Sequence, residues 1–95
     1  MYSMVILRRN LHEIRAFAEM AVRDGVRLRY MLPMREIDGQ TIMTSAEAMS
    51  EAATALEHVA GWLEARGGME WSARDAHANA RVLRNRLAEG IHAPM

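Results

Sequence analysis

The sequence predicts an α/β fold in which a strand, a helix and a parallel second strand are followed by two amphipathic helices. Three observations indicate this class. A strand-length run of aliphatic residues lies near the start, a second run alternates apolar and basic residues, and the segments between and after them carry apolar residues at three- and four-residue spacing. At 95 residues the chain makes one small domain with a thin margin of stability.

The first strand is expected within residues 2–9, where residues 4–7 form a continuous apolar run. Such a run is typical of a strand that is buried on both faces, as in a parallel sheet. Asn10 follows it, and Glu13 stands three residues later, which is the spacing of a capping box. We therefore expect a helix to begin at Leu11.

That helix is expected to end at Asp24-Gly25, because glycine readily takes the left-handed conformation that closes a helix. The next run, residues 26–32, alternates between two faces and stops at Pro33. One face would carry Val26, Leu28, Tyr30 and Leu32, and the other Arg27, Arg29 and Met31. Residues 2–33 therefore predict a parallel strand-helix-strand unit, a connection that is right-handed in about 98% of cases.

The rest of the chain is predicted to be a connecting segment and two helices. Residues 34–43 contain an Asp-Gly turn signal, which fits either a loop or a short hairpin. Thr44 and the acidic residue three positions later form a second capping box, which predicts a long helix over 44–67. Ser72, again with an acidic residue three positions on, is expected to cap a final helix over 72–90.

Composition excludes several classes of function. The formal net charge is zero, so no bulk electrostatic field favours nucleic acid as a partner. The chain has no cysteine, and its four histidines lack the spacing of a helical zinc motif. No apolar stretch approaches the roughly 20 residues of a membrane span, and the opening MYSMVILRRN is the reverse of a secretion signal. We expect a cytoplasmic protein without a membrane partner.

Arginines gather on or just after the two predicted strands. The carboxyl ends of parallel strands are where such sheets bind ligands, so an anionic ligand is one interpretation of this cluster. In the alternative interpretation, Arg27 and Arg29 face solvent and pair with Glu36 or Asp38. The cluster consists of Arg8, Arg9, Arg27, Arg29 and Arg35.

The stretch MVILRRNLHEIRAFAEMAVRDGVRLRYMLPM resembles the late barrel segment of radical S-adenosylmethionine enzymes. In that family a strand of the form V-x-L-R-x-N precedes x-x-E-I, a helix, a glycine, and a strand that ends near R-F or R-Y before a proline. The molybdenum-cofactor and peptide-modifying branches are the most similar. The resemblance continues through a glycine-containing loop into the helix TSAEAMSEAATALEHVAGWLE, and covers about Val5 to Leu63.

This resemblance implies the carboxyl-terminal part of a partial (β/α)6 barrel. Arg8 and Asn10 would lie near the charged end of S-adenosylmethionine, and Arg29 would be a further cofactor-binding residue. Its base would meet Met31, Leu32 and Met34. The family also implies a [4Fe-4S] cluster held by a C-x-x-x-C-x-x-C loop. This chain lacks that loop and the first four strands, so we expect it to carry no cofactor alone and not to catalyse the family's reaction unaided.

Three hypotheses about function follow from these patterns. The first is a barrel fragment that needs a partner chain or self-association, since two lone strands expose the edges of their ladder. The second is a small non-catalytic interaction module that presents the Ala and Met face of the helix over 45–66 to a partner helix. The third is a free-standing anion or nucleotide binder that uses the arginine cluster.

Overall fold

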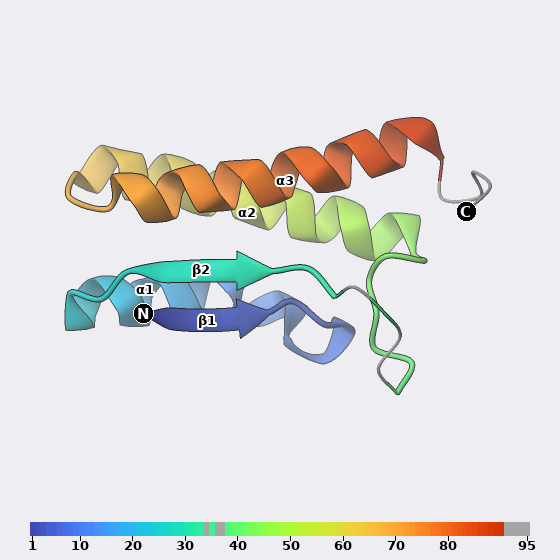
Figure 1. Cartoon of the computed structure of the whole chain (residues 1–95), viewed down its shortest axis with the longest axis horizontal. Helices are drawn as coiled ribbons and strands as arrows, with labels where there is room; N and C mark the ends of the chain where they lie inside the picture. Colours follow the sequence, from blue (N-terminus) through green and yellow to red (C-terminus); the bar gives the residue numbers. More distant parts are fainter. Residues whose placement is uncertain (34, 36–37, 91–95) are drawn as a thin grey trace.

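The computed structural model describes residues 1–33, 35 and 38–90 and has the α/β architecture that the sequence predicts (Figure 1). Its elements are the strands β1 (Tyr2–Val5) and β2 (Leu28–Met31), the 3-10 helix η1 (Arg8–Glu13), and the α-helices α1 (Ile14–Asp24), α2 (Ala46–Arg66) and α3 (Glu70–Glu89). In the described part of the chain, no helix combines the length and apolar content that crossing a bilayer requires.

The two strands form a parallel pair joined by α1, so the predicted crossover unit is confirmed. Their register sets Tyr2 beside Leu28 and Val5 beside Met31. One hydrogen bond continues the pairing beyond the strand, where Ile6 N–H donates to the Met31 carbonyl at 2.9 Å. A short hairpin around the Asp-Gly turn would pair residues 36–37 with residues 41–43. Residues 41–43 are not a strand, and residues 36–37 lie outside the described residues.

α1 covers one face of this sheet. The Phe17 ring packs against Tyr30, with ring centroids 5.9 Å apart, and against Tyr2 at 6.3 Å. The Tyr30 hydroxyl donates to the Ile14 carbonyl at 2.7 Å, so the buried polar tip has a partner. The opposite face lies open, and Val5 is 37% exposed. The expectation of a first strand buried on both faces is therefore wrong.

Asn10 does not cap α1, contrary to the sequence prediction. Its Oδ1 accepts from Leu7 N–H at 2.8 Å, and its Nδ2 donates to the Val5 carbonyl at 2.8 Å. The chain forms η1 first, and α1 begins only at Ile14, after Glu13 at its N-cap. The helix starts later because the asparagine closes the turn that leaves β1.

The caps of the last two helices also differ from the prediction. Ser45, not Thr44, caps α2, and its hydroxyl accepts from Ala48 N–H at 3.1 Å. α3 begins at Glu70, so Ser72 lies inside the helix and does not cap it. The long helix and the final helix are nevertheless present over most of the predicted residues.

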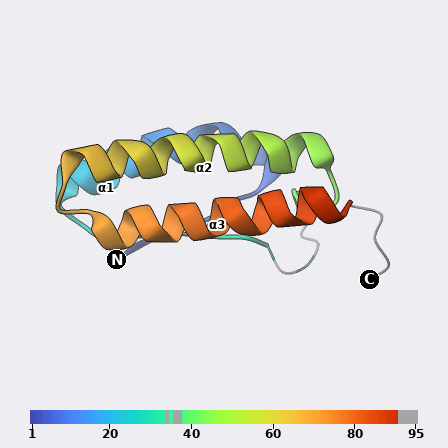
Figure 2. The same cartoon turned by 90° about the horizontal axis from the view of Figure 1, so that it is seen from above.

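α2 and α3 lie side by side in an antiparallel pair that rests on the rest of the molecule (Figure 2). α2 packs over α1, and α3 lies along the outer edge of β2. Small side chains fill much of the seam between the two long helices. The largest fully buried side chains of the core are Ile6, Ile14, Leu28, Ile42, Met49, Leu56, Leu63 and Leu83.

Gly25, the residue that closes α1, allows a test of how a positive φ affects stability. Gly25 has a φ of 65° and closes α1, whereas Gly61 lies within α2, and an added Cβ would meet nothing within 4 Å at either position. We expect Gly25→Ala to lower the free energy of unfolding by about 1 kcal/mol because alanine is strained at positive φ. The matched change Gly61→Ala should raise it by about 0.5–1 kcal/mol. Urea unfolding measures both, and equal effects would contradict the strain argument.

Candidate functional site

Side chains of α3 occupy the outer edge of β2, in the place where a third strand would otherwise pair. The Ser72 hydroxyl accepts from Leu28 N–H at 3.0 Å, and an Asp75 carboxylate oxygen accepts from Tyr30 N–H at 2.7 Å. Asn79 Nδ2 donates to the Tyr30 carbonyl at 2.9 Å. The three polar residues stand at positions i, i+3 and i+7, so they share one face of the helix. We call this arrangement the sealed edge.

The carboxylate of the sealed edge has a perturbed titration. Burial raises the pKa of Asp75 above its ordinary value of 3.8, against the opposing effects of the hydrogen bond from Tyr30 N–H and of the Arg29 charge. Asn79 Nδ2 also donates to the Asp75 backbone carbonyl at 3.0 Å, which holds the amide beside the carboxylate. Burial likewise raises the pKa of the Tyr30 hydroxyl, which stays a neutral donor.

The other side of the strand pair, along β1, is open. Tyr2 and Ile6 direct their N–H groups toward β2, so the N–H groups of Ser3 and Val5 point away from it. The Val5 carbonyl is bound by the Asn10 amide, but no hydrogen bond within residues 1–33, 35 and 38–90 engages the Ser3 and Val5 N–H groups. We call this row the open edge.

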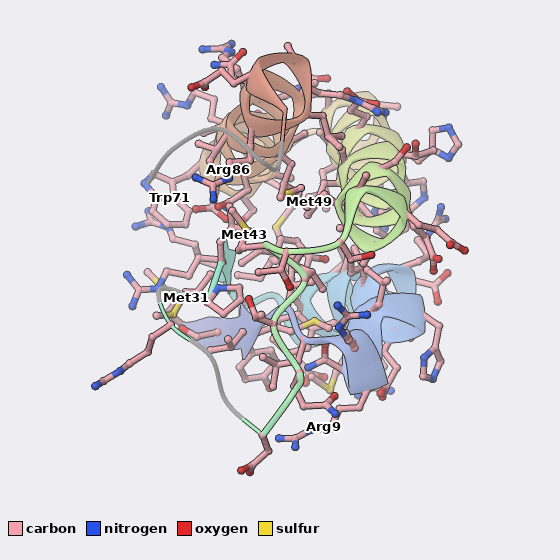
Figure 3. The ribbon with its side chains drawn as sticks, turned by 90° about the vertical axis from the view of Figure 1, so that its right-hand side faces the viewer. Arg9, Met31, Met43, Met49, Trp71 and Arg86 are labelled. Atoms are coloured by element: carbon pink, nitrogen blue, oxygen red, sulfur yellow. The ribbon has the colours of Figure 1, made fainter. Side chains whose placement is uncertain are left out.

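The sheet face turned away from α1 is the second exposed feature, and we call it the open face. Figure 3 shows the Met31 side chain on one side of the sheet and α1 on the other. Met31 is 38% exposed, and Arg27 and Arg29 are exposed beside it. Arg27 stacks over the Trp71 ring, 4.9 Å from its centroid, which fixes part of the positive charge on this face. The open face consists of Ser3, Val5, Arg27, Arg29 and Met31.

A mainly apolar groove lies beside the open edge, on the α1 side of the sheet. It has a volume of about 370 Å³, and its polar lining residues Asn10 and Glu13 both come from η1. Met4 contributes from β1, while Phe17 and Met20 contribute from α1. The full lining is Met4, Asn10, Glu13, Ala16, Phe17 and Met20.

The structure separates the six residues that the sequence analysis singled out for ligand binding. Arg29 and Met31 share the open face, whereas Leu32 packs against the hydrophobic core. Arg8 Nε donates to the Thr41 carbonyl at 2.9 Å, so Arg8 is tied to the loop before α2. Asn10 serves the chain leaving β1, as described above, and Met34 lies outside the described residues.

Other candidate groups of chemical interest are scattered. His77 pairs with Glu64 at 3.0 Å, and His12 lies 3.9 Å from Glu13, both on the surface. Among the described residues, no group of three or more His, Asp or Glu side chains is placed to hold a metal ion. The arrangement can therefore offer backbone hydrogen bonds, apolar contacts and arginine charges to a ligand.

The sequence pattern does not predict the sealed edge or the groove. Ser72 and the acidic residue three positions later have the spacing of a helix cap, although Asn79 extends the same polar stripe along α3. A stripe of short polar residues at positions i, i+3 and i+7 next to a stripe of alanines was the available signal. The groove left no comparable signal, because it depends on how α1 lies beside β1.

Comparison of the chain with models of protein families, with curated proteins and with solved structures found no match.

The raised pKa of Asp75 predicts that the free energy of unfolding depends on pH. In both states the carboxyl is protonated below about pH 3.8, and it ionises at lower pH in the unfolded chain than in the folded one. The free energy of unfolding therefore falls as the pH rises from about 3.8 through the raised pKa of Asp75 in the folded chain. We expect Asp75→Asn, which keeps an acceptor for Tyr30 N–H, to gain on the wild type between about pH 3 and about pH 7. Urea unfolding at both values measures this gain, and a constant difference would contradict it.

Ser72 provides a test of the sealed edge itself. Ser72→Ala leaves the buried Leu28 N–H without its acceptor, which should lower the free energy of unfolding by about 1–3 kcal/mol. The control Ser50→Ala removes a hydroxyl from α2 and should change stability by less than about 0.5 kcal/mol. Thermal unfolding of the two variants compares them, and equal losses would show that the Leu28 contact contributes little.

Proposed function

We propose that this chain is the carboxyl-terminal part of a partial barrel of the radical S-adenosylmethionine kind, and that it does not catalyse the reaction alone. Another polypeptide would supply the preceding strands and the cluster-binding cysteines. The sequence pattern from Val5 to Leu63 suggests this family. The difference between the two edges of the sheet is the structural observation that supports it.

A last strand of an open barrel needs its outer edge protected, while the strand before it needs a neighbour. β2 has the sealed edge, which α3 fills with three side chains. β1 has the open edge, with two N–H groups that lack a protein partner in the described chain. The outer edge of β2 is therefore protected. The outer edge of β1, where the preceding strand of a barrel would pair, is open.

The open face supports the same proposal. In a barrel, helices cover the outer face of each strand, and the inner face lines the lumen. α1 covers one face of the pair, and the bare face carries Arg29 and Met31. A guanidinium suits the carboxylate of S-adenosylmethionine, and a thioether suits the face of its base. These two residues would contribute to holding the cofactor if a partner closed the barrel.

The chain does not fit the [4Fe-4S] cluster. Such a cluster needs three or four thiolates, and this sequence contains no cysteine. Cleavage of S-adenosylmethionine would therefore rest with the other polypeptide. The role proposed for the present chain is to complete the barrel wall and to bind part of the cofactor.

The geometry favours this proposal over the interaction module. In that alternative, α2 would present its Ala and Met face to a partner helix. Met49, Ala52 and Ala53 on that face are fully buried within the chain, where α2 meets α3 and α1. The free anion binder also loses support, because Arg8, one of the five arginines of the cluster, is bound to the Thr41 carbonyl.

Affinity purification of the tagged chain from its native cells tests the proposal. We expect recovery of a polypeptide that contains a C-x-x-x-C-x-x-C loop, with about four irons per complex after anaerobic purification. The complex should bind S-adenosylmethionine in a dialysis assay, and the chain alone should not. Arg29→Ala should weaken that binding about tenfold, while the exposed Arg81→Ala on α3 should leave it unchanged.

Two results would overturn the proposal. One is a partner that lacks the three cysteines. The other is a complex whose affinity for S-adenosylmethionine is the same with Arg29→Ala as with the control.

A further inference from the structure

We propose that the open edge of β1 binds an extended strand of another polypeptide, with apolar side chains at alternate positions and acidic side chains between them. This inference rests on the proposed function only in taking a separate chain as the source of the strand. It adds the chemistry by which that strand would be recognised, and three independent observations carry it.

The first observation is the hydrogen-bonding pattern of the edge. The Ser3 and Val5 N–H groups point outward two residues apart, which is the repeat of a strand ladder. An added strand would accept from both of them through alternate carbonyl groups. Neither residue is charged and neither is proline, so two of the devices that protect an edge are absent at these positions.

The second observation is the groove next to that edge. Alternate side chains of a strand beside β1 would point toward the α1 side of the sheet, where Met4, Phe17 and Met20 form an apolar wall. Its volume of about 370 Å³ has room for aliphatic side chains. Backbone bonds and pockets for alternate side chains are the two parts of recognition by strand addition. Apolar residues are therefore expected at every second position.

The third observation is the charge of the open face, toward which the remaining side chains of an added strand would point. Arg27 and Arg29 are exposed on this face, and none of its five residues is acidic. Neighbouring strands lie about 4.8 Å apart, so a residue on the added strand lies about 10 Å from β2. Long side chains such as glutamate and arginine can span that separation. Acidic residues are therefore expected between the apolar ones.

The same charge argues against a second copy of this chain. Two copies joined edge to edge through β1 would be related by a two-fold axis perpendicular to the sheet. Such an axis keeps each face on its own side, so the Arg27 and Arg29 pairs of both copies would share one continuous face. An acidic strand from a different polypeptide would neutralise this face, whereas a second copy would double its charge.

Fluorescence anisotropy with three labelled nine-residue peptides tests the inference on the full chain. One peptide alternates valine and glutamate, the second has the same composition in two blocks, and the third alternates valine and lysine. We expect saturable binding of the valine-glutamate peptide, at least about tenfold tighter than either control and weakened by salt. Equal binding of the alternating and block peptides, or tighter binding of the lysine peptide, would overturn the inference.

Variants of the chain locate the binding. Ser3→Pro removes an outward N–H that takes no part in the pairing with β2, so it should weaken the valine-glutamate peptide at least about tenfold while Ser3→Ala does not. Ala16→Glu places a charge in the groove and should weaken peptide binding to a similar degree. Ala65→Glu, at an exposed position of α2, should not change the binding. If Ser3→Pro unfolds the chain, the two glutamate variants still decide the matter.

The outcomes separate this inference from the proposed function. Peptide binding at the open edge together with a native partner that lacks the cysteine loop would overturn the proposed function alone. Recovery of a cysteine-loop partner equally by the wild type and by Ala16→Glu would overturn this inference alone. A dimer seen by light scattering that Ala16→Glu dissociates would show that the occupant is a second copy.

Discussion

The hydrogen bonds between α3 side chains and the outer edge of β2 position the long helices against the strand pair. Two parallel strands do not form a stable sheet alone, and a buried N–H without an acceptor is strongly unfavourable. Ser72, Asp75 and Asn79 meet three backbone groups of Leu28 and Tyr30. Because these contacts fix α3 along β2, its antiparallel partner α2 is brought over α1. Both long helices are thereby placed on one side of the strand pair, and the open edge remains on the other.

The two long helices pack against each other, and β2 packs along α3. Only 5% of the residues are aromatic, so the core depends on close packing of small side chains. Ala53, Ala60, Ala76 and Ala80 are buried, and they let α2 and α3 approach closely. The few large buried residues can then fill the space between the helices and the strands. A chain of this composition forms a core by bringing backbones close together.

The elements of the fold could be predicted from local periodicity, but the partners of its short polar residues could not. Alternation along 26–32 correctly divides Leu28 and Tyr30 from Arg29 and Met31. Asn10 and Ser72 carry cap signals, yet both bind strand backbone instead. A short polar side chain satisfies whichever backbone group lies within reach, and the tertiary arrangement decides which one that is. The groove depends on the placement of α1 against β1, which no local pattern encodes.

The contrast between the two edges explains how a short strand can be both open and selective. β1 has four residues, and the Asn10 amide already occupies the Val5 carbonyl, so the length of edge available to an arbitrary strand is small. A ladder this short binds weakly through its backbone alone. Selective association must then depend on the side chains of the incoming strand. Those on one side of it would contact the apolar groove, and those on the other side would face the arginines of the open face. The short length of β1 therefore limits aggregation, and it also makes the affinity depend on the side-chain pattern of the incoming strand.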